Sequence, residues 1–235
     1  MIGKKIFEGI NLTVAYQDDD KLIYPLREAN FYIRETDIAV IEGVRDSGKS
    51  LMLKVIAGEH DFQKGEIVIN DKNISNVLTE QDRKLWKLRQ AFLIPDYYEL
   101  IDDETVAMNI ELPLILLNYS KRLCRRQMTL ACEAFQMLEI RDVKANELTP
   151  ELTFRVMCAR ALVADPRLIL IDDPFTNMLR YFEIESQRHM IDEINFCIQV
   201  LKNLNRTLLI TAREKSRYIY HNRLYRHLFS KLILT

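Results

Sequence analysis

Apolar residues form three short runs that lie far apart along the chain. Residues 38–41 read IAVI, residues 168–171 read LILI, and residues 207–211 read TLLIT. A continuous apolar run of this length, without alternation, is typical of a strand that is buried on both faces of a sheet. Segments with a helical period follow or separate these runs, at residues 50–57, 152–164 and 183–204. Strands that alternate with helices predict a parallel α/β core.

A different pattern precedes the first of these runs. Short β-like runs separated by turn-like polar residues occur there, at residues 5–7, 12–16 and 29–33. We therefore expect an antiparallel sheet at the start of the chain. Residues 66–69 predict one more strand, and residues 80–146 are mostly helical in period. We expect that helical region to be broken around Pro95 and Pro113, because proline lacks the N–H group that a helix uses.

Length and charge narrow the class of protein. The chain has 235 residues, which suits one large domain or one domain with a subdomain. Its formal net charge is −1, so we expect no nucleic-acid partner. No stretch approaches the ~20 apolar residues of a membrane-spanning helix, so direct membrane insertion is not expected and any membrane role requires a partner. The four cysteines lack CxxC spacing and are expected to be reduced, partly buried thiols.

The first candidate site follows directly after the first buried run. Residues 43–50 read GVRDSGKS and match the phosphate-loop pattern GxxxxGK[ST] between a predicted strand and a predicted helix. Backbone N–H groups of such a loop converge on phosphate oxygens, assisted by the helix N-terminus. Lys49 is expected to face the β- and γ-phosphates of ATP, and Ser50 is expected to ligate Mg²⁺. Asp46 places a carboxylate where phosphate approaches, and Arg45 beside it would neutralise that charge.

A second candidate site ends the second buried run. Residues 168–174 read LILIDDP, so the strand delivers a carboxylate to its carboxyl end. Ligands of open α/β sheets bind at that edge. Asp172 is therefore expected to hold Mg²⁺, directly or through water.

With both sites placed, the chain resembles the ATP-binding subunits of ABC transporters. It is most similar to the subgroup of lipoprotein-releasing, macrolide-exporter and cell-division ATPases. Residues 105–114 (TVAMNIELPL) resemble that subgroup's TVxxNVxLPL, and residues 155–162 (RVMCARAL) resemble RVAIARAL. Asp165-Pro166, followed by the acidic strand, fits the family pattern DPxhhhhDEP. Tyr16 falls where the family stacks adenine on an aromatic ring.

The resemblance implies a fold and a set of site residues. The fold is an α/β P-loop NTPase fold of the ABC nucleotide-binding type, with a RecA-like core and an N-terminal antiparallel sheet. A single domain of residues 1–235 is expected, with an inserted helical subdomain at residues 79–146. The implied nucleotide-binding residues are Tyr16, Gly43, Ser47, Gly48, Lys49, Ser50 and Leu51.

Several positions depart from the family pattern. The glutamine that senses the γ-phosphate falls on Pro95, and the switch histidine falls on Ala212. The catalytic glutamate falls on Asp173, which keeps the carboxylate but is one methylene shorter. The signature LSGGQ falls on residues 148–152 (LTPEL), where both glycines are replaced. The aspartate of the dimer-contacting loop falls on Leu179.

Retained phosphate-loop residues beside replaced catalytic residues predict ATP binding with weak or absent hydrolysis. The implied partners are an integral membrane permease and a second ABC ATPase subunit, in a homodimer or a heterodimer. The permease would contact a region that holds Tyr97 and Tyr98, and the chain would lie peripherally on the cytoplasmic face of the cell membrane. Two alternatives remain open: a working ABC ATPase with substituted catalytic residues, and an ATP-binding scaffold or regulator without a transport role.

Overall fold

The computed structural model describes most of the chain. The described residues are 4–18, 21–44, 46–69, 71–73, 85–86, 88–97, 99–174, 184–213 and 230–233. Arg45, Tyr98, Leu179 and the expected start of the helical subdomain at Thr79 lie outside them.

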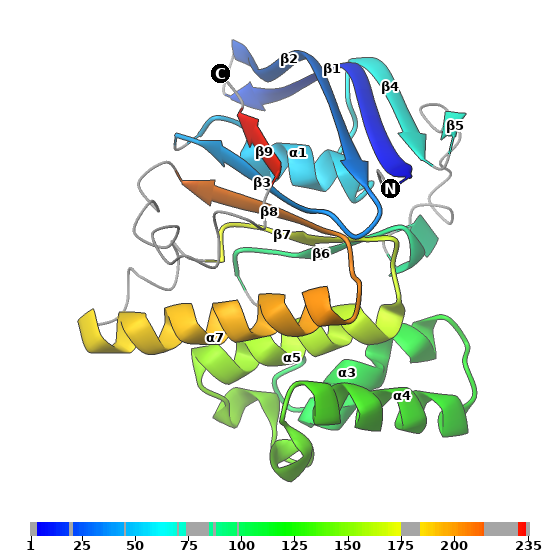
Figure 1. Cartoon of the computed structure of the whole chain (residues 1–235), viewed down its shortest axis with the longest axis vertical. Helices are drawn as coiled ribbons and strands as arrows, with labels where there is room; N and C mark the ends of the chain where they lie inside the picture. The colour runs from blue at the N-terminus through cyan, green and yellow to red at the C-terminus, as the bar shows by residue number, and fades with distance from the viewer. Residues whose placement is uncertain are drawn as a thin grey trace.

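An antiparallel sheet forms the N-terminal part of the fold, as predicted. Its strand order is β2-β1-β4-β5 (Figure 1). The bounds are Lys5–Asp18 for β1, Lys21–Arg34 for β2, Lys64–Ile69 for β4 and Lys72–Asn73 for β5.

The first strand is longer than the sequence predicts. The two expected runs are parts of one strand of 14 residues, β1, which shifts its register against β2 between Gly9 and Leu12. Asn11 lies in this shift with a φ of 47°. Phe7 and Leu12 are an odd number of positions apart, so they would face opposite sides of a regular strand. Because the shift adds one residue on β1, both side chains stay buried. Gly65 is required here, since a Cβ on it would lie 2.6 Å from the carbonyl oxygen of Asn11.

A parallel sheet forms the centre of the molecule. Its order is β6-β7-β8-β3-β9, and every neighbouring pair is parallel. The bounds are Ala91–Ile94 for β6, Leu168–Ile171 for β7, Leu208–Arg213 for β8, Ile38–Gly43 for β3 and Ser230–Ile233 for β9. All carboxyl ends therefore meet at one edge of this sheet.

The three predicted buried strands are confirmed as β3, β7 and β8, but two strands of the parallel sheet were not predicted. Strand β6 lies inside the region that was expected to be helical, and β9 lies near the C-terminus. A run of four apolar residues within a segment of helical periodicity cannot be recognised as a strand from the sequence pattern alone. Pairing with β7 decides the conformation of β6, and pairing with β3 decides that of β9.

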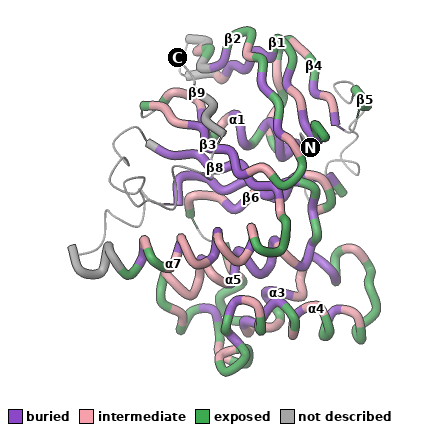
Figure 2. Tube along the Cα trace, viewed as in Figure 1, coloured by how far each residue is buried: buried purple, intermediate pink, exposed green. Residues whose placement is uncertain are grey.

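Helices cover both faces of the parallel sheet (Figure 1). Helix α1, Lys49–Ile56, lies between the two sheets and shares a core with them. The other face is covered by α5 and α7, Pro150–Ala164 and Ile184–Asn203, and beyond these lie α3 and α4, Val106–Leu116 and Lys121–Ala134. Two short 3₁₀ helices, Leu138–Ile140 and Ala145–Glu147, connect α4 to α5. Figure 2 shows buried residues along the facing sides of these layers.

The expected helix break at Pro113 is wrong, because α3 continues through this residue. Proline leaves the carbonyl group four residues earlier without its helical donor. That carbonyl belongs to Asn109, and the Nε group of Arg160 donates to it at 2.8 Å. A long-range contact from α5 therefore replaces the missing hydrogen bond of α3.

Asn109 and Arg160 form a buried polar cluster that joins α3, α5 and the segment before α3. The Nη1 group of Arg160 donates to the carbonyl of Glu99 at 2.7 Å, and the Nη2 group donates to the side-chain oxygen of Asn109. The side-chain amide of Asn109 donates in turn to the carbonyl of Ile101 at 3.0 Å. Burial lowers the pKa of Arg160 to about 10.

The four cysteines are free, as the sequence predicts, and all four are buried, although only partial burial was expected. Burial raises the pKa of the Cys132 thiol to about 11, so the thiol stays protonated at neutral pH. Among the described helices, none is long and apolar enough to cross a membrane.

Candidate functional site

The phosphate-loop sequence connects β3 to α1. Strand β3 ends at Gly43 and α1 begins at Lys49. Gly48 precedes the helix in the left-handed region, with a φ of 82°, and Asp46 also has a positive φ, 61°. Aspartate tolerates this conformation better than most residues, which explains how the loop accommodates it. Gly43 is needed for close packing, because a Cβ there would lie 2.6 Å from the hydroxyl of Ser47.

The side chain of Lys49 is buried inside this loop, with 7% of its surface exposed. Its ammonium group donates to the carbonyl of Gly43 at 2.9 Å, to the carbonyl of Val44 at 2.5 Å and to the hydroxyl of Ser47 at 3.0 Å. The loop thus folds around the positive charge and holds it at the carboxyl end of β3. An anion that enters the loop meets this charge together with backbone N–H groups at the start of α1.

The carboxylate of Asp172 lies next to the start of α1. Its Oδ1 atom accepts hydrogen bonds from the Ser50 hydroxyl at 3.0 Å and from the Thr211 hydroxyl at 2.6 Å. Burial raises the pKa of Asp172, while these two hydrogen bonds act in the opposite direction. The two residues expected to hold Mg²⁺, Ser50 and Asp172, are therefore in direct contact although they are 122 positions apart.

Thr211 is a site residue that the sequence analysis missed. Its hydroxyl donates to the carboxylate of Asp172 and accepts from the backbone N–H of Asp173 at 2.8 Å. The sequence feature that could have indicated Thr211 is a hydroxyl residue at the end of an otherwise apolar run. Such a group is fully buried here and requires partners, which the neighbouring strand provides.

Asp173 follows directly and has an unusual backbone conformation. Its φ is 38°, and 8% of its surface is exposed. A left-handed residue after a buried strand turns the chain sharply at the sheet edge. The N–H group of Asp173 is fixed by Thr211, so the direction of this turn is defined by β8.

Pro95 and Ala212 lie at the same edge of the sheet. Pro95 follows Ile94, whose carbonyl accepts from the N–H group of Asp172 at 2.9 Å. Ala212 is opposite Glu42 in the register of β3 and β8 and is fully buried. The structure therefore gathers both positions around Asp172, and neither side chain has a polar atom.

Tyr16 and Leu51, which are also expected to bind the nucleotide, have different surroundings from the residues above. Leu51 lies in the first turn of α1 and packs against the core between the two sheets. Tyr16 is partly buried near the end of β1, opposite Ile23 of β2. Among the described contacts, no hydrogen bond or ring contact connects Tyr16 with the phosphate loop.

The segment on which the family signature is expected to fall, residues 148–152, leads into the start of α5. Thr149 is the N-cap, and its hydroxyl accepts from the N–H group of Leu152 at 3.5 Å. Pro150 occupies the first helical position, where the missing N–H group costs the helix nothing. Glu151 lies in the first turn, where a negative charge is favourable. All three residues thus favour the start of a helix.

Comparison with known proteins gives a consistent family assignment. The family described as ABC transporter matches residues 26–176. The ABC transporter ATP-binding protein MJ0796 of Methanocaldococcus jannaschii, which is described as uncharacterized, is 32% identical over 169 residues, covering 70% of this chain and 71% of that protein. The lipoprotein-releasing system ATP-binding protein LolD of Buchnera aphidicola is 28% identical over 173 residues, covering 74% and 75%. The methionine import ATP-binding protein MetN of Clostridioides difficile is 27% identical over 192 residues, or 82% of this chain, and the match spans only 57% of MetN.

The fold comparison agrees with the family assignment. A dimeric structure of MJ0796 in a post-hydrolysis state bound to ADP and Pi matches with a TM-score of 0.74. The match covers 97% of this chain and 94% of that chain at 22% identity. The predicted fold class, an α/β P-loop fold of the ABC nucleotide-binding type, is confirmed.

The raised pKa of Asp172 leads to a prediction about stability. A raised pKa means that the folded chain binds this proton more tightly than the unfolded chain does, so ionisation costs stability as the pH rises through the folded pKa. We expect Asp172→Asn, which keeps an oxygen acceptor for Ser50 and Thr211, to be more stable than the wild type at pH 7. The difference should shrink as the pH falls toward the ordinary carboxyl pKa of 3.8. Urea denaturation at both pH values measures it.

The matched control is Asp103→Asn, because Asp103 is an exposed carboxyl outside the site. It should show no such pH-dependent gain. A wild type that is more stable than Asp172→Asn at pH 7 would contradict the prediction.

Proposed function

Because this chain belongs to the ABC transporter family, we propose that it is the ATP-binding subunit of a membrane transporter and that it has largely lost its own ATP hydrolysis. The observation that carries this proposal is a contrast at one sheet edge. Lys49, Ser50 and Asp172 form a connected group that suits a nucleotide. The neighbouring positions 95 and 212 hold proline and alanine, which supply no polar side-chain group.

ATP binding is supported by the geometry of the phosphate loop. The buried ammonium group of Lys49 lies among loop carbonyls that fix its direction. Backbone N–H groups of the loop and the first turn of α1 would receive phosphate oxygens. The related MJ0796 has been observed with ADP and Pi, which agrees with this assignment.

The residues present also fit a magnesium ion. Mg²⁺ usually keeps several waters and takes one or two protein ligands together with substrate phosphates. Ser50 and Asp172 supply a hydroxyl and a carboxylate in contact at 3.0 Å. Among the described residues no cluster of three or more His, Cys, Asp or Glu side chains offers a metal cage, so the phosphate-bound mode is the one that fits. Mg²⁺ bound there would neutralise charge on the β- and γ-phosphates.

The first functional prediction concerns Lys49. Replacing Lys49 with alanine removes the buried charge that faces the phosphates, so the affinity for ATP should fall by about tenfold or more. Isothermal titration calorimetry with Mg²⁺ and ATP measures the change. Lys54→Ala is the control, because Lys54 is exposed on the same helix and should leave the affinity unchanged. Equal affinities for Lys49→Ala and the wild type would refute the assignment of this loop.

Weak hydrolysis is inferred from three positions around Asp172. Pro95 and Ala212 provide neither a hydrogen-bond donor nor an acceptor from their side chains. Asp173 retains a carboxylate, but it is one methylene shorter than glutamate, and its backbone is held by Thr211. A displacement of about 1 Å of a catalytic group can cost about 100-fold in rate. A positioned acid or base is itself worth about 10²–10⁴-fold.

We therefore expect the purified chain to hydrolyse ATP far below an ordinary enzyme rate of about 1–10 s⁻¹. A steady-state phosphate-release assay with Mg²⁺ and ATP measures this rate. Lys49→Ala supplies the background, since activity that survives this change does not come from the loop. A wild-type rate in the ordinary range that is lost in Lys49→Ala would favour the alternative of a working ATPase.

The proposed assembly is a permease with a second ATP-binding subunit. LolD and MetN are named for lipoprotein release and methionine import, so transport is the function that the relatives share. Tyr97, which directly follows Pro95 and Asp96, is 58% exposed and offers apolar area with a polar end for such a contact. We infer a peripheral position on the cytoplasmic face of the membrane, held by the permease.

The start of α5 argues against an ATP-driven homodimer. In the proposed dimer this segment would face the nucleotide of the other subunit, and Pro150 offers no N–H group while Glu151 adds a negative charge. A partner subunit with an intact signature would avoid this problem in one of the two sites. A permease that holds both subunits would instead make ATP-driven dimerisation unnecessary.

Sedimentation velocity of the pure chain with Mg²⁺ and ATP tests this inference. We expect the chain to remain monomeric, because neither site of a homodimer would have a complete signature. The double variant Pro150→Gly/Glu151→Gly should dimerise with ATP if the signature is the defect. A clear monomer-to-dimer shift of the wild type on adding ATP would overturn the proposal.

A further inference from the structure

The edge of the parallel sheet opposite the phosphate loop collects arginine residues. Arg89 lies two positions before β6, Arg167 one position before β7, and Arg206 two positions before β8. These strands are adjacent in the order β6-β7-β8 and run parallel. Because the amino ends of parallel strands meet at one edge, the three arginines approach each other although they are far apart in sequence.

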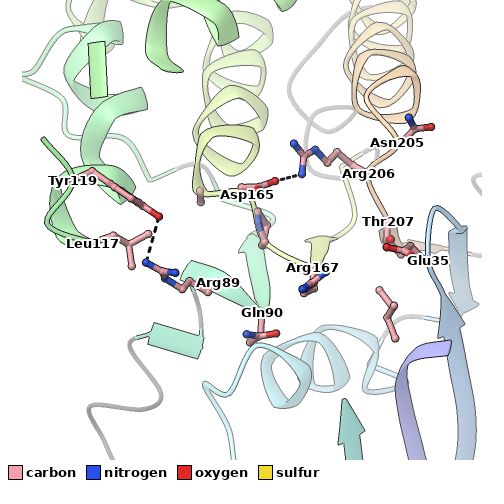
Figure 3. A pocket seen from close by; sticks show the side chains of 13 residues that line it. Glu35, Arg89, Gln90, Leu117, Tyr119, Asp165, Arg167, Asn205, Arg206 and Thr207 are labelled. Carbon is pink, nitrogen blue, oxygen red and sulfur yellow. Dashed lines mark hydrogen bonds and ion pairs between the residues drawn. The ribbon is translucent and has the colours of Figure 1, made fainter. Parts of the chain in front are cut away.

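A pocket lies at this edge. Its volume is about 370 Å³, which is in the range of small-molecule sites. All three arginines line it, together with Gln90, Tyr119 and Thr207 among others. Figure 3 shows the side chains of Arg89, Arg167 and Arg206 around this space, with Gln90 between Arg89 and Arg167 in this view.

The positive charges of the pocket are only partly compensated. Arg206 forms an ion pair with Asp165, yet its Nε atom is buried without a hydrogen-bond partner in the described part of the chain. Arg89 donates to the Tyr119 hydroxyl over a long distance of 3.4 Å. No described carboxylate forms an ion pair with Arg89 or Arg167, and both arginines are exposed to solvent.

The backbone fixes two of these arginines relative to each other. The N–H group of Arg167 donates to the carbonyl of Arg89 at 3.3 Å, and the N–H group of Leu168 donates to the carbonyl of Gln90 at 2.9 Å. The two arginines are therefore fixed at neighbouring backbone positions just before two adjacent strands. Guanidinium groups bind carboxylates and phosphates through two parallel hydrogen bonds each, so such a pair suits a ligand with several anionic oxygens.

The acidic residue Glu35 gives the pocket a polarity. It lies beside Thr207, on the other side of the pocket from Arg89 and Tyr119 (Figure 3). An acceptor at that end favours a hydroxyl or amino group on the part of a ligand farthest from its anionic oxygens.

We propose that this pocket binds a small polar anion that carries at least two negative charges, either a polycarboxylate or a phosphate ester. Arg89 and Arg167 provide the anion contacts, and Arg206 contributes its free Nε donor. The site is at the opposite end of the strands from the phosphate loop and does not depend on ATP binding.

Calorimetric titration with citrate, and separately with inorganic phosphate, tests the proposal. The protein used is the Lys49→Ala chain, so that phosphate cannot bind through the lysine of the loop. Mg²⁺ is omitted because citrate chelates it, and sodium chloride keeps the ionic strength constant. We expect saturable binding of at least one anion with a Kd of about 1 mM or tighter. The stronger of the two anions identifies the carboxylate or the phosphate class.

Four further variants, each added to Lys49→Ala, decide whether the pocket is responsible. Arg89→Gln and Arg167→Gln should each weaken binding by roughly tenfold, and circular dichroism confirms that they are folded. Arg167→Lys keeps the charge but loses the two-pronged hydrogen bonding, so it should weaken binding less than Arg167→Gln. Arg126→Gln, an equal change of charge on the exposed face of α4, should bind as the Lys49→Ala chain does. Absence of saturable binding of both anions, or an equal loss in Arg126→Gln, would overturn the proposal. Neither result would affect the assignment of the phosphate loop, which the ATP titration tests separately.

Discussion

The hydrogen bonds of the Asp172 carboxylate connect the parts of this fold that form the candidate site. One oxygen accepts from Ser50 at the start of α1 and from Thr211 near the end of β8, while the residue itself directly follows β7. A buried carboxylate needs such partners, because burial without them would leave an uncompensated charge. The positions of the loop, the acidic strand and the neighbouring strand are thereby fixed by one group. The surrounding positions, including Pro95 and Asp173, take their places from the same pairing of strands.

A second buried cluster, around Arg160, connects the helical layers. Arg160 of α5 replaces the donor that Pro113 removes from α3, and it also binds the segment that follows Pro95 through the carbonyl of Glu99. The charged guanidinium group is tolerated because five-donor arginine finds several acceptors at once. The sheet edge with the phosphate loop and the helices beyond it are thus joined by directional contacts as well as by the apolar core.

The residues that are proposed to depart from the family pattern suit their local structure. Ala212 is fully buried in β8, Thr149 caps α5, and Pro150 occupies the first helical position. Each of these residues suits the local packing or the helix start. In the proposed function, the alanine and the proline lack the polar groups that a catalytic or dimer-contacting role would need, whereas Thr149 keeps a hydroxyl. Residues that serve a function often lower the stability of the structure around them. Residues that favour local stability at such positions are therefore consistent with a weaker requirement for catalysis.

The sequence by itself determined the phosphate loop, the acidic strand, the buried character of β3, β7 and β8, and the family. These features are local, because a glycine pattern and an uninterrupted apolar run have one favoured structural context each. The tertiary structure alone decided four others: strand β6, the continuous path of α3 through Pro113, the role of Thr211, and the approach of three arginines at the amino edge of the sheet. Each of these depends on a partner that is distant in sequence. A four-residue strand needs a neighbour to pair with, a proline-bearing helix needs a donor from another helix, and a buried hydroxyl needs a carboxylate on the next strand. Such contacts are fixed by the order of strands and the packing of helices, and no local pattern encodes that order.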